Sequence, residues 1–315
     1  MAVTEVQSAS LKGLKSPTRA EIEGAVGPFI TKRMSMSSPE WREIFEREAR
    51  KEKKLHRKEQ LRKIIPWRKH ARHLEVVSGH YETHWSQIPW PKTHHADPAE
   101  KTIVSFWENE GMLIRGYGRK RAHHLLFARI VRELKPRRAL EVGCGNGFNL
   151  LIMATVFPEM EWHGVELTEA GVQVGSSIQQ EVELPEALRE FSVEPIADPG
   201  AHRKVKLRQG DASRLPYRDG EFDLVFSFLA LEQMQSVRDQ ALSEMARVTA
   251  RHTINVEPFR DYNQLPIQKH YREARGYLDL QINEMARFGL NPIFTFDHWP
   301  QKLTLAAGAV VTEKK

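Results

Sequence analysis

The chain has 315 residues, of which 40% are hydrophobic and 28% are charged. This composition is typical of a folded domain and argues against disorder of the whole chain, and no stretch approaches the roughly 20 apolar residues that a membrane span requires. A single cysteine, Cys144, excludes an intrachain disulfide framework and a cysteine-rich zinc site. The residues after Met1 lack the basic and apolar regions of a secretory signal, so we expect a cytoplasmic protein with no membrane partner.

The net charge of +6 comes from one short stretch of the chain. Between Arg50 and His73 the sequence has eleven Lys or Arg residues against Glu52 and Glu59, a local charge of +9, so the remaining residues together carry −3. We interpret residues 50–73 as the solvated face of a helix. RNA or another polyanion, with Trp67 as a base-stacking ring, and a protein or homodimer interface through the N-terminal region are the alternatives.

The first 118 residues divide into a tail and a cap region. Residues 1–38 are rich in Ser, Gly, Thr and Pro with weak periodicity, which predicts a flexible tail. A helical pattern starts at Pro39 and stops at Pro66, and residues 67–115 are irregular and aromatic. Tryptophans are concentrated here, and we expect this helical and aromatic cap region, residues 39–118, to pack on the second half. The tryptophans concerned are Trp41, Trp67, Trp85, Trp90 and Trp107.

Residues 119–315 alternate short apolar runs with helical patterns, which is typical of βα units on a parallel sheet. We predict helices at 119–134, 148–156, 186–191 and 235–249, and strands at 139–142, 162–166, 205–209, 222–228, 253–256, 293–298 and 303–311. The last two strands, joined by a turn at Pro300 and Gln301, form an antiparallel hairpin. The fold class is therefore α/β, a Rossmann-like, mostly parallel seven-stranded sheet with insertions at about 181–201 and 258–275.

A glycine-rich loop follows the first of these strands. The sequence reads Glu141-x-Gly143-x-Gly145-x-Gly147 and then enters a helix. Glycines permit a tight turn and close approach of the backbone to a ligand, and the helix start offers free N–H groups. The dinucleotide fingerprint G-x-G-x-x-G fails, because the position of its third glycine holds Phe148.

This loop resembles motif I of the class I S-adenosylmethionine (SAM)-dependent methyltransferases, and three downstream segments agree with that family. The resemblance covers about residues 119–315 and implies that SAM is the cofactor. It implies that Glu166 binds the ribose hydroxyls, that Asp211 faces the adenine with Ala212 giving a backbone contact, and that Phe228 and Leu229 lie beside the adenosine. The cofactor-binding residues expected on this basis are Tyr117, Glu141, Gly143, Cys144, Gly145, Gly147, Asn149, Glu166, Leu167, Asp211, Ala212, Phe228 and Leu229.

The sequence does not identify a catalytic base. Glu232, Glu257, Tyr117 and His298 are the candidates, and Gln233 stands where the resembling family often has a histidine. Four other histidines lie among tryptophans, where we favour surface or packing roles over a lid contact and over a metal site, because no cysteine accompanies them. They are His80, His84, His94 and His95. We expect no bound metal.

The resemblance implies in-line transfer of the methyl group that the SAM sulfonium activates, with alignment as the main contribution of the protein. We expect a small-molecule acceptor. S-methylation of an amino-acid thioether such as methionine is an alternative. It would need a partner for the substrate's carboxylate, such as Arg115 or Arg260, and a partner for its ammonium, such as Glu257. Two further hypotheses are an RNA- or protein-modifying methyltransferase that uses residues 50–73, and a SAM-binding protein without catalysis.

Overall fold

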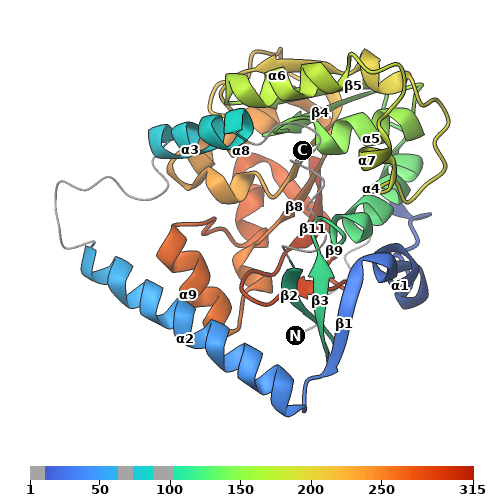
Figure 1. Cartoon of the computed structure of the whole chain (residues 1–315). Helices are drawn as coiled ribbons and strands as arrows, with labels where there is room; N and C mark the ends of the chain where they lie inside the picture. Colours follow the sequence, from blue (N-terminus) through green and yellow to red (C-terminus); the bar gives the residue numbers. More distant parts are fainter. Residues whose placement is uncertain (1–10, 63–73, 88–101) are drawn as a thin grey trace.

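Two β-sheets organise the computed structural model, which describes residues 11–62, 74–87 and 102–315 (Figure 1). The larger sheet has seven strands in the order β6-β5-β4-β7-β8-β11-β9, and the smaller has four in the order β1-β3-β2-β10. No helix within the described ranges combines the length and the apolar character needed to cross a membrane.

The larger sheet is the predicted Rossmann-like sheet. Its strands are β4 (Arg138–Val142), β5 (Glu161–Glu166), β6 (Lys206–Gln209), β7 (Phe222–Phe228), β8 (Thr249–Glu257), β9 (Leu290–Phe296) and β11 (Gly308–Lys314). The pairs among β4, β5, β6, β7 and β8 are parallel, whereas β11 runs antiparallel to both β8 and β9. The expected fold class, with its antiparallel terminal hairpin, is confirmed.

Alternation of side chains along the strands builds a core on each face of this sheet. Ala139 and Phe226 point into one apolar cluster, while Leu140 and Val225 point into the other. Such two-sided burial is what a parallel sheet covered by helices requires. Helices α4 (Lys120–Leu134) and α5 (Phe148–Val156) contribute to the first cluster, and α8 (Arg238–Val248) contributes to the second.

The N-terminal region is more ordered than the predicted flexible tail over its described part, residues 11–38. The chain forms α1 (Arg19–Val26), a 3₁₀ helix (Gly27–Phe29) and β1 (Ile30–Ser35). Thr18 and Glu21 form a capping box at the start of α1, and Glu21 also pairs with Arg129 of α4. Buried apolar side chains of this segment join the core of the larger sheet, which local composition could not predict. They are Leu11, Leu14, Ile22, Val26 and Phe29.

The cap region was predicted to be mainly helical, but the structure also contains strands there. β2 (Thr102–Trp107) and β3 (Glu110–Arg115) form an antiparallel hairpin between β1 and β10 (Gln301–Lys302). The last strand of the larger sheet was expected at 303–311 but starts only at Gly308. Before it, the side chains of Trp299 and Gln301 hydrogen-bond to the backbone of Ala307 and fold the intervening segment into a loop.

Helix α2 (Pro39–Arg62) lies along the outside of the molecule beside α9 (Pro266–Arg275), the helix of the predicted insertion at 258–275 (Figure 1). Glu52 of α2 is almost completely buried and receives a hydrogen bond of 2.6 Å from Arg275. His56 lies 2.9 Å from Glu273 of the same helix as Arg275. The far end of the predicted helix, residues 63–65, falls outside the described residues.

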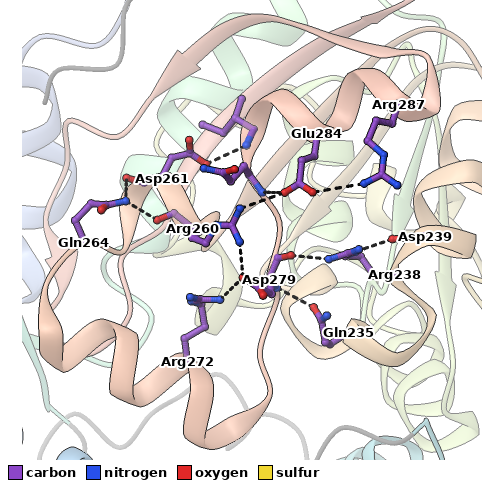
Figure 2. Close-up of polar contacts among 12 residues, drawn as sticks. Gln235, Arg238, Asp239, Arg260, Asp261, Gln264, Arg272, Asp279, Glu284 and Arg287 are labelled. Carbon is purple, nitrogen blue, oxygen red and sulfur yellow. Dashed lines mark hydrogen bonds and ion pairs between the residues drawn. The ribbon is translucent and has the colours of Figure 1, made fainter.

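Asp279 ties this insertion to the rest of the domain (Figure 2). Its carboxylate receives Arg272 at 2.7 Å and Arg260 at 3.3 Å, and its backbone N–H donates to the side chain of Gln235 at 2.8 Å. Arg260 also lies 3.6 Å from Glu284 in the 3₁₀ helix Ile282–Phe288. Ion pairs from Arg260 and Arg272 therefore hold the insertion against the segment that follows it.

Three helices complete the described structure. They are α3 (Leu74–Gln87), α6 (Glu169–Ile178) and α7 (Glu186–Arg189), with short 3₁₀ turns at Ala201–Lys204, Leu231–Gln233, Gln235–Val237 and Arg260–Tyr262. α7 lies in the predicted insertion at 181–201, which closes on itself through a hydrogen bond from Leu184 N to Pro199 O. α3 lies beside α6 at the edge of the larger sheet (Figure 1).

Candidate functional site

A cavity of about 370 Å³ lies at the carboxyl ends of β4, β5 and β7. The strand order reverses between β4 and β7, because the chain passes from β4 to β5 and β6 on one side and returns to β7 and β8 on the other. Ligands of open α/β sheets bind at such a switch point. All the expected cofactor-binding residues except Gly147 line this cavity.

The glycine loop has the conformation that its sequence requires. Gly143, Gly145 and Gly147 have φ angles of +73°, +57° and +79°, a region that side chains disfavour. A Cβ atom on Gly143 would lie 2.6 Å from the Cβ of Ala230, so close packing also demands glycine there. Gly147 lies at the start of α5, where its role is to turn the chain.

Glu141 is fully buried beneath the loop and anchors a polar network. Asn149 donates to its Oε1 at 2.6 Å, and His124 Nε2 lies 2.9 Å from the amide oxygen of Asn149. Glu141 Oε2 is buried and has no hydrogen-bond partner among the described residues. Burial raises the pKa of this carboxyl to about 8, and a cationic ligand beside the open Oε2 would favour its charged form.

Lys120, at the start of α4, brings a positive charge to the same part of the cavity. Its ammonium lies 4.6 Å from the ring centre of Tyr117 and 4.5 Å from that of Phe148. Burial lowers the pKa of Lys120 to about 8, and the charge of Glu141 opposes that shift. The cavity therefore offers a cationic side chain for the carboxylate of an amino-acid group, and close to it a carboxyl oxygen for the ammonium. We did not predict Lys120 from the sequence, although its place three residues after Tyr117 was a signal.

Glu166 ends β5 and lines the cavity as expected. Its Oε2 accepts from the Gly145 N–H at 3.0 Å, and its Oε1 accepts from the backbone and hydroxyl of Thr168 at 3.0 and 2.7 Å. These bonds fix the carboxylate and leave Oε2 with a lone pair for a ligand hydroxyl, because Oε1 already accepts two hydrogen bonds. The arrangement is compatible with the predicted ribose contact.

Asp211, Ala212, Phe228 and Leu229 line the cavity beyond Glu166. Asp211 is held by the Ser213 N–H at 2.8 Å. Leu229 has a φ of +54°, which is unusual for a residue with a branched side chain and costs backbone energy where the chain leaves β7. The strained turn places Leu229 and Ala230 at the cavity wall.

Helix α3, part of the cap region that we expected to pack on the second half of the chain, roofs the cavity. Six of its side chains face the cavity, namely Val77, Ser78, His80, Tyr81, His84 and Trp85. Glu82 accepts from the Ala170 N–H at 3.2 Å at the start of α6, where a carboxylate is favoured by the helix dipole. His80 and His84 thus belong to the roof, whereas His94 and His95 lie outside the described residues. Within the described ranges, no group of three His, Cys, Asp or Glu side chains could hold a metal ion.

Two of the four candidate bases lie away from the cavity. Glu257 is fully buried and accepts from the backbone N–H groups of Ala230, Leu231 and Glu232 at 2.9 to 3.2 Å, so it shapes the turn after β7. His298 is half exposed and lies 3.4 Å from Glu108. Glu232 and Tyr117 do line the cavity.

The two arginines expected to bind the carboxylate of an amino-acid acceptor also lie outside the cavity. Arg260 is bound to Asp279 and Glu284 in the insertion, and Arg115 lies over the ring of Phe29. Neither residue lines the cavity. Cys144 does line it, but burial raises the pKa of its thiol well above the usual value, which agrees with a packing role.

Comparison with known proteins agrees with this site. Residues 140–254 match the family model of the methyltransferase domain. Ajmaline N-methyltransferase of Rauvolfia serpentina is 31% identical over 118 residues, 38% of this chain and 34% of that protein. The probable chloroplastic tocopherol O-methyltransferase of Oryza sativa subsp. japonica is 31% identical over 118 residues, 38% of this chain and 27% of that protein. The chain thus spans about a third or less of these relatives.

The fold is also that of a solved structure, the [4+2]-cyclase SpnF. That structure covers 78% of this chain and 97% of its own, with a TM-score of 0.51 and 15% sequence identity. At this identity the similarity concerns the fold alone.

The residues of the cavity fit SAM. The buried, unpartnered Glu141 Oε2 and the ammonium of Lys120 suit the charges of its amino-acid end. The carboxylates of Glu166 and Asp211 suit hydroxyl and amino donors, and both residues line the cavity together with the glycine loop. On the family match over residues 140–254, the motif and the fold, the chain contains a class I SAM-dependent methyltransferase domain, with SAM as its cofactor.

Proposed function

We propose that the protein is a SAM-dependent methyltransferase that acts on a small-molecule acceptor. The observation that carries this proposal is the roof that α3 forms over the cavity. A volume of about 370 Å³ between the roof and the strand ends is of the size that small ligands occupy. The names of the curated relatives support a small acceptor.

The residues of the chain would act chiefly by binding and orientation. Bound SAM supplies a methyl group already activated by its sulfonium. Glu166 would hold the ribose, and Glu141 with Lys120 would hold the amino-acid group. Orientation of this kind contributes up to roughly 7–11 kcal/mol to a bimolecular reaction.

Glu232 is the best placed of the candidate bases. It follows β7, lines the cavity and accepts a hydrogen bond of 2.7 Å from Gln233. A base is needed only when the acceptor must lose a proton, as with a hydroxyl or an ammonium. Tyr117 is less suited, because burial raises the pKa of its hydroxyl. For a thioether acceptor such as methionine, Glu232 would instead face a substrate cation.

The test is calorimetry with SAM, followed by an assay of S-adenosylhomocysteine release with a panel of small acceptors. We expect micromolar SAM binding and turnover of a small molecule. Binding without turnover of any small acceptor, together with methylation of RNA or protein, would favour the macromolecular alternative. Binding without any methyl transfer would favour a SAM-binding protein without catalysis.

A further inference from the structure

Gln233 brings a side-chain amide to the cavity that the cofactor-binding residues do not account for. The residue is only 9% exposed and lines the cavity beside Glu232. Its Nε2 donates to Glu232 Oε1 at 2.7 Å, whereas its Oε1 is buried and has no hydrogen-bond partner among the described residues. A buried acceptor without a partner costs free energy, so its place in a ligand cavity calls for a donor on the ligand.

The bond to Glu232 fixes the orientation of this amide. Turning the amide over would set its oxygen against the carboxylate oxygen, and two acceptors do not share a hydrogen bond. The amide oxygen of Gln233 therefore faces away from Glu232 Oε1. It still lies within a few ångströms of that carboxylate, because it shares a carbon atom with Nε2. Two acceptor groups thus lie close together on residues that line the cavity.

The turn that carries both residues is held by its own backbone bonds. The two residues end the 3₁₀ helix Leu231–Gln233, in which the Gln233 N–H donates to the carbonyl of Ala230 at 3.0 Å. The buried Glu257 accepts from three successive backbone N–H groups that begin at Ala230. The two acceptor groups are therefore held on a fixed backbone before a ligand arrives.

This turn lies against the glycine loop, at one end of the cofactor-binding residues. A Cβ atom on Gly143 would come within 2.6 Å of the Ala230 Cβ and 3.1 Å of the Met234 Cε. Glu166 and Asp211 follow β5 and β6, whereas the turn follows β7 on the other side of β4. Cofactor bound between the glycine loop and Glu166 would leave the end of the cavity at β7 for the methyl acceptor.

We propose that Gln233 Oε1 and the Glu232 carboxylate accept the two N–H groups of the methyl acceptor, so that the substrate is a small primary amine. This inference rests on the proposed function and adds the substrate class. A carboxylate has about four acceptor sites, so Glu232 can accept from the substrate as well as from Gln233. A neutral primary amine has two hydrogens for these two groups and one lone pair for the methyl group. A hydroxyl leaves one of the two groups without a substrate donor, and a thioether leaves both.

The two residues have different parts in the transfer. The nitrogen lone pair forms the bond to the methyl carbon as the bond between that carbon and sulfur breaks, and the electron pair of the broken bond remains on sulfur. The methylated nitrogen is then positively charged and loses one proton to the Glu232 carboxylate, which passes it to solvent. Gln233 holds the other N–H and takes up no proton, because an amide oxygen is only a hydrogen-bond acceptor here.

The experiment compares amines with hydroxyl compounds of the same skeleton as methyl acceptors. The pairs are phenethylamine and phenethyl alcohol, tryptamine and tryptophol, and anthranilate and salicylate. Release of S-adenosylhomocysteine is measured after SAM binding has been verified by calorimetry. We expect at least one amine to exceed its hydroxyl partner tenfold or more in kcat/KM, because a site built for a donor rejects the analogue that lacks it. Equal or better turnover of the hydroxyl compounds overturns the proposal.

Gln233→Met tests the residue itself, since methionine has a similar length and no amide. We expect KM for the amine to rise about tenfold or more and the preference for amine over hydroxyl to fall, with the SAM Kd unchanged. Gln180→Met, a change at an exposed glutamine after α6, is the matched control. A Gln233→Met protein that keeps the amine preference overturns the assignment, and one that loses SAM affinity overturns it by placing Gln233 in the cofactor site.

The six compounds are also titrated into protein saturated with S-adenosylhomocysteine, which measures binding without turnover. Tighter binding of amines than of their hydroxyl partners, lost in Gln233→Met, supports the proposal. Binding without that preference, or of no amine at all, overturns it while the proposed function stands. A folded protein that fails to bind SAM overturns the proposed function, and this inference with it.

Discussion

The indole ring of Trp85 lies directly over Gly145. A Cβ atom on Gly145 would come within 2.9 Å of Trp85 Cζ2, closer than real side chains approach one another. The two residues belong to the roof and to the glycine loop, which are separated by 60 positions in the chain. The absence of a side chain at Gly145 therefore serves the roof as well as the tight turn.

Gly145→Ala should weaken SAM binding by tenfold or more. The new methyl group meets Trp85, and the φ of +57° strains any residue other than glycine by roughly 1–2 kcal/mol. Gly289→Ala is a matched control, because Gly289 has a φ of +77° with nothing within 4 Å of the added Cβ. The control should lose about 1 kcal/mol of unfolding free energy and no SAM affinity. Calorimetry and chemical denaturation measure both, and equal SAM binding by the two variants would contradict the contact with the roof.

Glu166→Gln should reduce SAM affinity by about 10- to 100-fold, since a carboxamide replaces one acceptor oxygen with a donor. Competition by adenosine and 2′,3′-dideoxyadenosine isolates the ribose contribution: wild-type protein should prefer adenosine, and the variant should lose most of that preference. Glu169→Gln, an exposed change at the start of α6, is the control and should leave both affinities unaltered. A variant that still distinguishes the two nucleosides would remove Glu166 from the ribose site.

Glu257→Gln tests whether this residue shapes the turn after β7. Burial and the nearby Glu232 raise its pKa from 4.5 to about 8 in the folded protein, despite the backbone amides that favour its charge. The folded state therefore holds more protons than the unfolded state between these values, so stability should fall as the pH rises from about 4.5 to about 8. Glu141 shifts in the same direction, so the variant removes only part of this slope.

The Glu257→Gln protein should be less stable at pH 5 by about 1–3 kcal/mol, because one amide oxygen cannot serve three backbone donors. Its loss of stability between pH 5 and pH 8 should be smaller than that of the wild type. Thermal unfolding at several pH values measures both effects. An inactive variant of wild-type stability would restore Glu257 as a candidate base.

The sequence predicted the parts of the site that local pattern controls. An apolar strand followed by glycines at 143, 145 and 147 can only turn sharply, and acids at the ends of parallel strands must meet at one edge of the sheet. Glu166 and Asp211 therefore lie where the spacing placed them. The strand ends of the larger sheet follow from the same alternation of apolar runs and helices.

The sequence indicated that the aromatic cap region packs on the second half, but it could not show which of its residues face the cavity, nor the smaller sheet, because contacts distant in sequence hold both. Among the side chains of α3 whose burial the structure describes, only Val77 and Trp85 are buried hydrophobic residues, so its periodicity is weak, and Glu82 reaches a partner 88 positions away. β10 has two residues, too few for any pattern, and it pairs with a strand almost 200 positions earlier. The hairpin of β2 and β3 did carry a signal, a β-branched and aromatic run followed by a turn at Asn109.

The exposed basic face of α2 provides the test between a small acceptor and RNA. Lys53, Lys54, Arg57 and Lys58 are exposed, and none has an ion-pair partner within the described part of the chain, unlike Arg50 and Lys51. Their replacement by glutamine should leave SAM affinity and small-molecule turnover within twofold, because α2 contacts α9 through its other face, where Glu52 meets Arg275.

An RNA-modifying enzyme would respond differently to the same four changes. Each lysine or arginine that contacts a phosphate contributes about one to the slope of log affinity against log salt, so the variant would bind RNA more weakly and with a slope reduced by up to about four. Glu43→Gln with Glu46→Gln, on the exposed part of the same helix, is the control for a general effect of surface charge. Retained turnover of a small acceptor together with unaltered RNA binding would leave the basic face as a solvated surface, and loss of methyl transfer to RNA in the variant would contradict the proposed function.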